Sequence, residues 1–388
     1  MFATIDTHNI ADAAQRGRAH GQQAAAAVAH SMQTYARLFA QAGWSWPQVC
    51  ARAMAFEPLV AEVDSALVDE VRGIAEGSGQ SVGAIWALNC RSEILPPNFM
   101  GDMGEASAEA LRVNADLGLR DWAQQGLDPA LQDGECTALS VSGRVSADGH
   151  SYFAQNWDWM GRQRQALVFL ATRNASGAPL VTLTEAGMLG KIGLNADGLA
   201  LGLNIIRSRD DGSRLGVPVH IVLRHLLGLP SVQAMRERLQ ALMAWGFGAS
   251  SNIPCADASG DVASFEVSPH GWAECVATAG TVAHSNHFLC ATLAPHQAPM
   301  APNLSSDLRL ATAQRHGATA LDRAGLEGFL RDQSDGEVAV CRSPDPSIPV
   351  EARVESVAGV IADVSAKRWW VAPNVPHLCA FEPAPVVW

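Results

Sequence analysis

The chain has 388 residues, of which 48% are hydrophobic and 17% are charged, and its formal net charge is −12. This composition predicts a folded protein with a sizeable core and excludes an intrinsically disordered chain. The acidic balance and the lack of a basic stripe argue against a nucleic-acid-binding protein, because such proteins carry a basic footprint.

The N-terminal region shows no sign of export or of membrane insertion. Residues 1–6 lack the charged segment and the long apolar run of a signal peptide. The longest apolar stretch nearby, residues 24–29, is far too short to span a bilayer. We therefore expect a cytoplasmic protein without a membrane partner.

Helical patterns dominate the first 135 residues. Apolar side chains recur at helical spacing over residues 11–41, 57–77 and 82–94. Glycines separate the last two of these segments. A weaker stretch, rich in alanine and leucine, covers residues 106–122.

The pattern changes at Cys136, where pairs of short strands begin to flank turns rich in Asn, Asp, Ser and Gly. Recurrent hairpins with grouped helices predict α+β layers rather than a doubly wound parallel sheet. The expected strand pairs are 137–142 with 151–156, 167–172 with 180–184, 191–194 with 200–204, 252–256 with 262–267, and 354–363 with 368–371. The expected helices are 217–227, 231–245, 307–316 and 325–332.

The eight cysteines are spread through the chain without a Cys-x-x-Cys pair. This spacing predicts neither a disulfide framework nor a zinc ribbon. His284 and His287 are three residues apart, but no further residue with zinc-like spacing accompanies them. We therefore expect no metal site, and among the cysteines only Cys136 has neighbours that suggest chemistry.

Cys136 directly follows a polar turn, Asp133-Gly134-Glu135. A thiol attacks well only as a thiolate, and its ordinary pKa is about 8.5. Cleavage of the chain before Cys136 would free an α-amine, whose pKa of about 7.7–8.0 makes it a base near neutrality. One residue would then supply both nucleophile and base, as an N-terminal threonine does. The local sequence alone nevertheless favours the simpler interpretation, a buried residue at the start of a strand.

The window from Gly134 to Thr137, followed by Gln155-Asn156-Trp157-Asp158-Trp159, resembles the acyl-CoA:6-aminopenicillanic acid acyltransferase family. These isopenicillin N acyltransferase-like proteins are N-terminal-nucleophile hydrolases. Further blocks in family order lie at residues 17–21, 88–94, 184–195, 284–288, 341–346, 354–358 and 370–373. The resemblance implies a four-layer αββα sandwich and self-cleavage before Cys136. It also implies two associated fragments, a mainly helical one of residues 1–135 and one of residues 136–388, which together form one domain.

The resemblance also implies roles for single residues. Cys136 would be the nucleophile, Asp158 would hold its α-amine, and Asn286 would belong to the oxyanion hole. Two departures from the family pattern stand next to the nucleophile: Glu135 replaces the usual Gly at the cleavage site, and Ala138 stands where Thr is common. Supporting roles are implied for Thr137, Ser250, Ser251 and Ser306.

The function that the resemblance implies is hydrolysis of a small N-acyl amine or amide through a thioester on Cys136, with no metal or organic cofactor. An acyl-CoA-dependent N-acyltransferase is the alternative within the same class. Glu135 also leaves a different class open, an uncleaved, non-catalytic binding protein. The expected partners are the small amide substrate and the chain's own two fragments, and the sequence leaves a homo-oligomer open.

Overall fold

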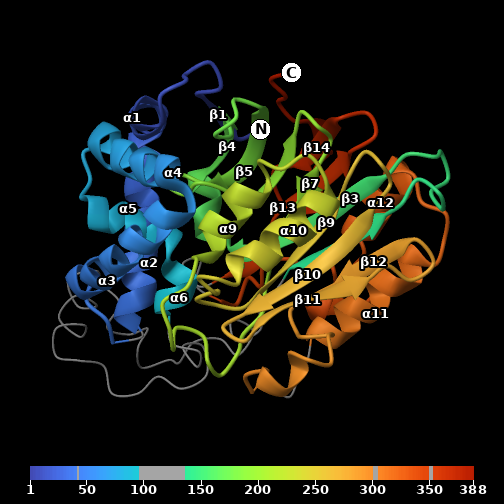
Figure 1. Cartoon of the computed structure of the whole chain (residues 1–388). Helices are drawn as coiled ribbons and strands as arrows, with labels where there is room; N and C mark the ends of the chain where they lie inside the picture. The colour runs from blue at the N-terminus through green and yellow to red at the C-terminus, as the bar shows by residue number, and fades with distance from the viewer. Residues whose placement is uncertain (42, 96–135, 300–304, 349–352) are drawn as a thin grey trace.

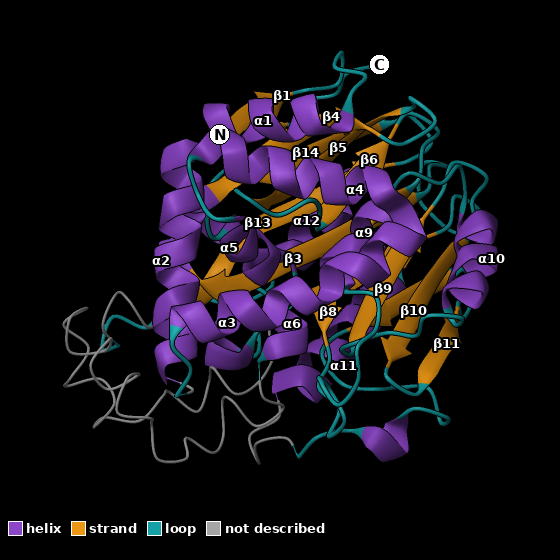
Figure 2. Ribbon diagram, turned by 60° about the vertical axis from the view of Figure 1, so that its left-hand side comes forward, coloured by secondary structure: helices purple, strands orange, loops and turns teal. Residues whose placement is uncertain are grey.

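Two β-sheets stacked face to face form the centre of the molecule, and helices cover the outer face of each sheet (Figures 1 and 2). The computed structural model describes residues 1–41, 43–95, 136–299, 305–348 and 353–388. Within these ranges the layers follow the order helix, sheet, sheet, helix. The expected αββα sandwich is therefore confirmed.

The larger sheet contains nine described strands, in the order β1-β4-β5-β6-β7-β9-β10-β11, with β8 also paired to β9. Its strands pair antiparallel, except that β1 pairs in parallel with β4. Their bounds are β1 (Ala3–Asp6), β4 (Leu167–Arg173), β5 (Pro179–Glu185), β6 (Ile192–Asn195), β7 (Ala200–Leu201), β8 (Asn204–Ile205), β9 (Ser251–Ala256), β10 (Val262–Ser268) and β11 (Gly271–Val276).

The smaller sheet contains six described strands, in the order β12-β2-β3-β13-β14-β15, and all of its pairs are antiparallel. The strand that follows Cys136, β2, lies between β12 and β3 in this sheet. The bounds are β2 (Thr137–Val141), β3 (Tyr152–Met160), β12 (Thr281–His284), β13 (Val354–Asp363), β14 (Arg368–Ala372) and β15 (Glu382–Pro383).

Alternate side chains of β3 show how the smaller sheet is covered on both faces. Phe153 and Trp157 belong to the large core between the sheets, whereas Tyr152 and Ala154 pack with helices α11 and α12 in a second core. Successive side chains of a strand point to opposite faces, so a strand that lies between two cores is buried on both faces. All nine residues of β3 are buried, as this arrangement requires.

The helices that cover the larger sheet come mainly from the N-terminal part of the chain, and α11 and α12 cover the smaller sheet. The helices are α1 (Ala13–Gln23), α2 (Ala25–Gln41), α3 (Trp46–Ala53), α4 (Glu57–Ser78), α5 (Val82–Asn89), α6 (Arg91–Ile94), α9 (Val219–Leu226), α10 (Val232–Leu242), α11 (Ser305–Gly317) and α12 (Arg323–Leu330). Short 3-10 helices are η1 (Met54–Phe56), η3 (Gly161–Ala166), η4 (Ala294–His296), η5 (Gly336–Val338) and η6 (Pro376–Leu378).

Glycines allow α1 and α4 to pack with their backbones in close contact. A Cβ atom added at Gly17 would lie 2.0 Å from the main-chain oxygen of Glu70, and one at Gly73 would lie 2.2 Å from that of Ala14. No side chain fits at such distances without moving one of the helices. The first block of the family resemblance, residues 17–21, therefore has a packing role.

All five expected hairpins are confirmed. Two expected helices are interrupted: residues 11–41 form α1 and α2, and residues 82–94 form α5 and α6. The sequence analysis did not anticipate β1, α3, β11 and β12. The helical stretch expected at 106–122 lies outside the described residues.

In the part of the chain that the structure describes, none of the helices combines the length and the apolarity needed to cross a membrane.

Candidate active site

Cys136 lies directly before β2, and only 4% of its surface is exposed. Its main-chain N–H donates a hydrogen bond to Asn286 Oδ1 at 2.9 Å, and its carbonyl oxygen accepts one from Arg309 Nη1 at 2.7 Å. The thiol faces the main-chain oxygen of Asp158 at 4.0 Å, the outer limit for a contact with sulfur. Both main-chain polar groups of Cys136 are therefore fixed by side chains from distant parts of the sequence.

The Cys136 thiol is held in its protonated form in the intact chain. Burial raises its pKa to about 11, and the negative charge of Asp158 adds to this effect. The positive charges of Lys191 and Arg309 act in the opposite direction. A base close to the sulfur is therefore needed before Cys136 can attack a carbonyl near neutral pH.

Asp158 is a buried carboxylic acid on β3. Its Oδ1 accepts a hydrogen bond from Ser356 Oγ at 2.6 Å, while its Oδ2 has no hydrogen-bond partner among the described residues. Burial raises the pKa of Asp158 to about 7, against the lowering effects of Arg309 and of the bond from Ser356. Asp158 titrates near neutrality, and its Oδ2 is available to accept a hydrogen bond from a further donor.

Asn286 follows β12 and reaches Cys136 from the next strand of the smaller sheet. Besides the Cys136 N–H, its Oδ1 accepts a hydrogen bond from Arg309 Nη2 at 3.0 Å. Its Nδ2 donates to the carbonyl oxygen of Ile205 at 2.8 Å. Because a side-chain amide nitrogen carries two hydrogens, one N–H of Asn286 remains for another acceptor.

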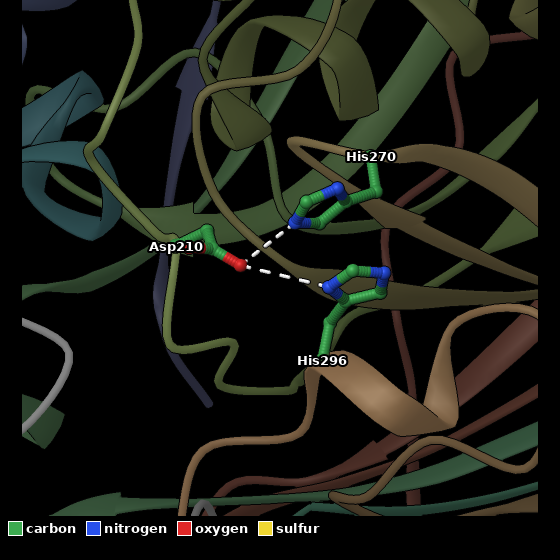
Figure 3. Close-up of side chains that lie close together, drawn as sticks. All are labelled: Asp210, His270 and His296. Atoms are coloured by element: carbon green, nitrogen blue, oxygen red, sulfur yellow. Dashed lines mark hydrogen bonds and ion pairs between the residues drawn. The ribbon is translucent and has the colours of Figure 1, made fainter.

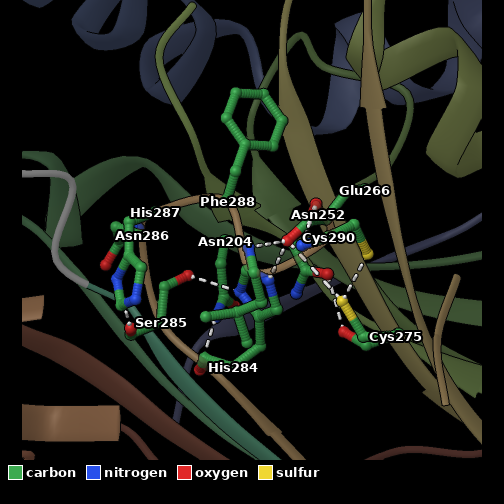
Figure 4. Close-up of polar contacts among 12 residues, drawn as sticks. Asn204, Asn252, Glu266, Cys275, His284, Ser285, Asn286, His287, Phe288 and Cys290 are labelled. Carbon is green, nitrogen blue, oxygen red and sulfur yellow. Dashed lines mark hydrogen bonds and ion pairs between the residues drawn. The ribbon is translucent and has the colours of Figure 1, made fainter. Parts of the chain in front are cut away.

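The loop that carries Asn286 is anchored by a buried carboxylate (Figure 4). Glu266 Oε1 lies 2.9 Å from His284 Nε2, and the Glu266 carboxylate also accepts hydrogen bonds from the main-chain N–H groups of Leu289 and Cys290. Asn204 Nδ2 donates to the carbonyl oxygen of His284 at 2.9 Å. These bonds fix both ends of the loop.

Ser306 supports the same loop from α11. Its hydroxyl accepts a hydrogen bond from the Asn286 main-chain N–H at 2.9 Å and lies 2.7 Å from His287 Nδ1. Ser285 Oγ also bonds to the hydroxyl and to the carbonyl oxygen of Ser306. Thr137, buried next to Cys136, accepts a hydrogen bond from Arg309 Nη1 at 2.9 Å.

Ser250 and Ser251 lie further from Cys136, and neither side chain is hydrogen-bonded to it among the described residues. Ser250 Oγ donates to Asp211 Oδ1 at 2.6 Å, and Ser251 pairs in the sheet with Ile205, the residue whose carbonyl oxygen binds Asn286. The structure thus brings Asp158, Asn286, Thr137 and Ser306 around Cys136 directly or through one contact. Ser251 is connected to Cys136 through Ile205 and Asn286, whereas the hydrogen bond of the Ser250 side chain goes to Asp211. Glu135, the other half of the predicted cleavage site, lies outside the described residues.

Arg309 is a site residue that the sequence analysis missed. Its buried guanidinium bonds to the Cys136 carbonyl oxygen, to Thr137 Oγ1 and to Asn286 Oδ1. One feature of the sequence could have indicated this role: Arg309 follows Ser306 by three residues, which places both side chains on one face of the same helix. Arg309 is thus the group that connects α11 to the start of β2 and to the Asn286 loop.

Lys191 is a second residue that the sequence analysis did not single out. The side chain is buried, with Nζ 3.7 Å from the centre of the Trp157 ring and 3.4 Å from Glu185 Oε1. Burial lowers the pKa of Lys191 to about 7, although Glu185 opposes this effect. The charge of Lys191 acts on the Cys136 thiol, so Lys191 places a titratable amine near the candidate site.

Glu185 connects Lys191 to residues of the N-terminal helices α2 and α6. Tyr35 donates a hydrogen bond to Glu185 Oε2 at 2.6 Å and accepts one from Trp159 Nε1 at 3.0 Å. Arg91 lies 3.7 Å from Glu185. Arg91 and Trp159 also line a pocket together with Ile205, next to Asn286.

The four layers define the class: this is the αββα sandwich of the N-terminal-nucleophile hydrolase type. More narrowly, the chain belongs to the acyl-coenzyme A:6-aminopenicillanic acid acyl-transferase family, whose model matches residues 145–374. The matched range contains Asp158 and Asn286 and begins after Cys136. The family resemblance found in the sequence is therefore confirmed.

Several known enzymes are similar to this chain. The acyl-coenzyme A:6-aminopenicillanic-acid-acyltransferase 40 kDa form of Emericella nidulans is 25% identical over 284 residues, which cover 71% of this chain and 66% of that protein. A conjugated bile acid hydrolase from Clostridium perfringens is 11% identical with a TM-score of 0.42, over 65% of this chain and 97% of the other. Penicillin V acylase from Agrobacterium tumefaciens is 16% identical with a TM-score of 0.34, over 61% and 83%.

Proposed function

We propose that the protein is a self-processing cysteine amidohydrolase that cleaves a small N-acyl amine or amide through a thioester on Cys136. One observation carries this proposal: the main-chain nitrogen of Cys136 is held by Asn286, while the adjacent Asp158 keeps one buried oxygen without a partner among the described residues. This arrangement suits a nitrogen that gains hydrogens when the chain is cut.

Maturation begins with attack of the Cys136 sulfur on the carbonyl carbon of Glu135. The peptide nitrogen takes up a proton as the carbon–nitrogen bond breaks, which leaves a thioester between the two residues. Water then opens the thioester and yields a carboxylate on Glu135 together with a free thiol and α-amine on Cys136. Asn286 Oδ1 accepts one hydrogen of the new amine, and Asp158 Oδ2 accepts another.

Contacts between the predicted fragments support their continued association after cleavage. In the first fragment, β1 pairs with β4 of the second, and Ile5 in β1 is buried. Tyr35 of the first fragment donates to Glu185 of the second at 2.6 Å. Fragments that share a sheet and a core are held together by the same packing that stabilises the domain.

In turnover, the neutral α-amine of Cys136 takes the thiol proton, and the thiolate attacks the carbonyl carbon of the substrate amide. The remaining N–H of Asn286 donates to the oxyanion, and an oxyanion-hole donor of this kind contributes about 2.7–4 kcal/mol in a serine protease of a different fold. The protonated α-amine then donates its proton to the leaving amine. Water hydrolyses the acyl thioester and regenerates the thiol.

The self-processing claim is tested by intact-mass measurement of purified protein. The wild type should give fragments of residues 1–135 and 136–388, whereas Cys136→Ala should give one full-length species. Cys255→Ala is the matched control, because Cys255 is equally buried and lies in β9. It should be processed like the wild type. A wild type that stays full length after long incubation would contradict self-cleavage and leave the non-catalytic binding protein as the alternative.

The family match favours a second function within the same class, an acyl-CoA-dependent N-acyltransferase. Both functions use the Cys136 thioester and differ in the acceptor, which is water in one case and an amine in the other. The test supplies the processed protein with acyl-CoA and a panel of amines and measures CoA release. Release that depends on the amine supports the transferase, and amide hydrolysis without such release supports the hydrolase.

A further inference from the structure

Two cysteine side chains meet outside the Cys136 site, where the edge of the larger sheet faces the loop that carries Asn286 (Figure 4). Cys275 lies in β11, Cys290 follows β12, and their sulfur atoms are 3.0 Å apart. Both side chains are partly exposed. A disulfide bond is about 2.03–2.05 Å long, so the two sulfur atoms need to approach by only about 1 Å to form one.

We propose that Cys275 and Cys290 form a reversible disulfide bond by exchange with a small disulfide such as oxidised glutathione. This modification site is separate from the catalysis proposed for Cys136. The bond would join the loop that carries Asn286 to β11, the strand at the edge of the larger sheet. Partly exposed disulfides are also the ones that small thiols reduce most readily, so the bond would be reversible.

The exchange proceeds in two balanced steps. The Cys290 sulfur, as a thiolate, attacks one sulfur of the small disulfide, whose sulfur–sulfur bond breaks and releases one thiolate. The Cys275 sulfur then attacks the Cys290 sulfur, and the second small thiolate leaves. The two leaving thiolates take up the two protons that the cysteines lose. The protein is oxidised by two electrons, and the small disulfide is reduced to two thiols.

The surroundings of Cys275 assign it to the second step. Its hydrogen bond to the Cys290 sulfur, its burial and the charge of Glu266 all raise the pKa of Cys275. Its sulfur also lies 3.6 Å from Glu266 Oε1, which can accept the thiol hydrogen. Cys275 therefore keeps its proton until the second step, and Cys290 is the sulfur that meets the oxidant first.

Both cysteines are accessible from one pocket. Cys275 and Cys290 line a pocket of about 580 Å³ between β11, β12 and the C-terminal end of α11. Cys90 and Cys255, by contrast, are fully buried. A small disulfide in solution therefore reaches this pair without unfolding the protein, whereas it does not reach the buried thiols.

The two segments that carry the cysteines are already held together by other bonds. Asp210 Oδ2 lies 2.7 Å from His270 Nε2, directly before β11, and 3.6 Å from His296 Nδ1, six residues after Cys290 (Figure 3). Glu266, on the strand that pairs with β11, accepts the main-chain N–H of Cys290 at 3.1 Å. Since a disulfide forms most easily where the backbone does not have to move, this arrangement favours the bond.

The bond would stabilise the loop that carries Asn286. A cross-link constrains the unfolded chain, and its effect grows with the length of the segment that it closes, here residues 275–290. The N–H groups of Leu289 and Cys290, which already bond to Glu266, should exchange their hydrogens more slowly once the bond has formed.

The test uses the full-length Cys136→Ala chain, in which the candidate nucleophile cannot compete for the oxidant. The reduced protein is incubated with excess oxidised glutathione, and its free thiols are then counted in denaturant. We expect the loss of two thiols and a mass lower by about 2 Da, both reversed by dithiothreitol. Chymotrypsin cuts the denatured chain after Phe288, between the two cysteines, so only the oxidised protein should yield their peptides joined.

Serine variants in the same chain test the pair and the order of attack. Cys275→Ser should retain one glutathione on Cys290, because the second step is blocked, and Cys290→Ser should react at least tenfold more slowly. Neither should yield the joined peptides. Cys50→Ser, which removes another partly exposed cysteine, is the matched control and should form the bond like its parent. Circular dichroism shows whether each variant is folded.

Three results would overturn the proposal. These are a parent chain that loses no thiols, a parent chain that carries glutathione on both cysteines without joining them, or a Cys290→Ser variant that reacts as fast as its parent. All of these measurements are made in a chain without the Cys136 thiol. Failure of the disulfide is therefore distinguishable from failure of the proposed amidohydrolase, which is tested by the self-cleavage of the wild type.

Discussion

Asp158 offers a test of the electrostatics of the site that needs no substrate. In the uncleaved Cys136→Ala chain, the Asp158 pKa of about 7 compares with an ordinary value of 3.8. Between these two values the folded protein holds a proton that the unfolded chain has released. Stability therefore falls as the pH rises from about 4 to 7. The cause is the cost of burying a carboxylate charge without a full set of partners.

The magnitude follows from the size of the shift. Each pKa unit corresponds to about 1.36 kcal/mol, so a shift of about three units lowers the free energy of unfolding at pH 8 by up to about 4 kcal/mol. Replacing Asp158 by Asn removes the charge and keeps the oxygen that accepts from Ser356. At pH 5 the aspartate protein has already lost about 1.6 kcal/mol, so the stability advantage of the Asn variant should grow by about 2.7 kcal/mol between pH 5 and pH 8.

Urea unfolding of Cys136→Ala with and without Asp158→Asn, followed by tryptophan fluorescence at pH 5 and pH 8, measures this difference. A stability difference that does not change with pH, or that favours aspartate at pH 8, refutes the reasoning. In the otherwise wild-type chain the same substitution should slow self-cleavage and turnover, because Asn cannot form an ion pair with an α-ammonium group. Removal of this one carboxylate would then both stabilise the fold and lower the activity.

Two further predictions concern Arg309 and the packing of the N-terminal helices. Arg309→Met should slow self-cleavage roughly ten- to hundredfold, because hydrogen bonds to charged groups contribute about 1.5–3 kcal/mol each. A time course on denaturing gels measures this rate. An unchanged rate would show that Arg309 does not position Cys136. Gly17→Ala should lower the free energy of unfolding by about 1–3 kcal/mol through overpacking of α1 against α4. Gly328→Ala, in α12 with no atom within 4 Å of the added Cβ, is its control and should be neutral or stabilising; equal losses in both would contradict the packing argument.

The elements that the sequence predicted best are those defined by local chemistry. Turn residues between apolar runs indicated all five hairpins, because a hairpin is specified over a few neighbouring residues. By contrast, β1 pairs with a strand more than 160 residues away, and its burial depends on that pairing. Asp158 and Asn286 were found through the family pattern. Arg309 and Lys191 were missed because their contacts depend on how α11 and the turn after β5 pack.

The helical part of the chain has a role in the site that its sequence did not reveal. Burial lowers the pKa of His20 to about 4, so its neutral ring can accept the N–H of Gly187 at 3.1 Å. Asn89 donates to the carbonyl oxygen of Gly187 at 2.9 Å. This turn leads to Lys191, whose ammonium group lies over Trp157 beside Asp158. His20 and Asn89, which belong to two of the family blocks, thus hold the turn that leads to Lys191, so the helical part of the chain helps to shape the candidate site.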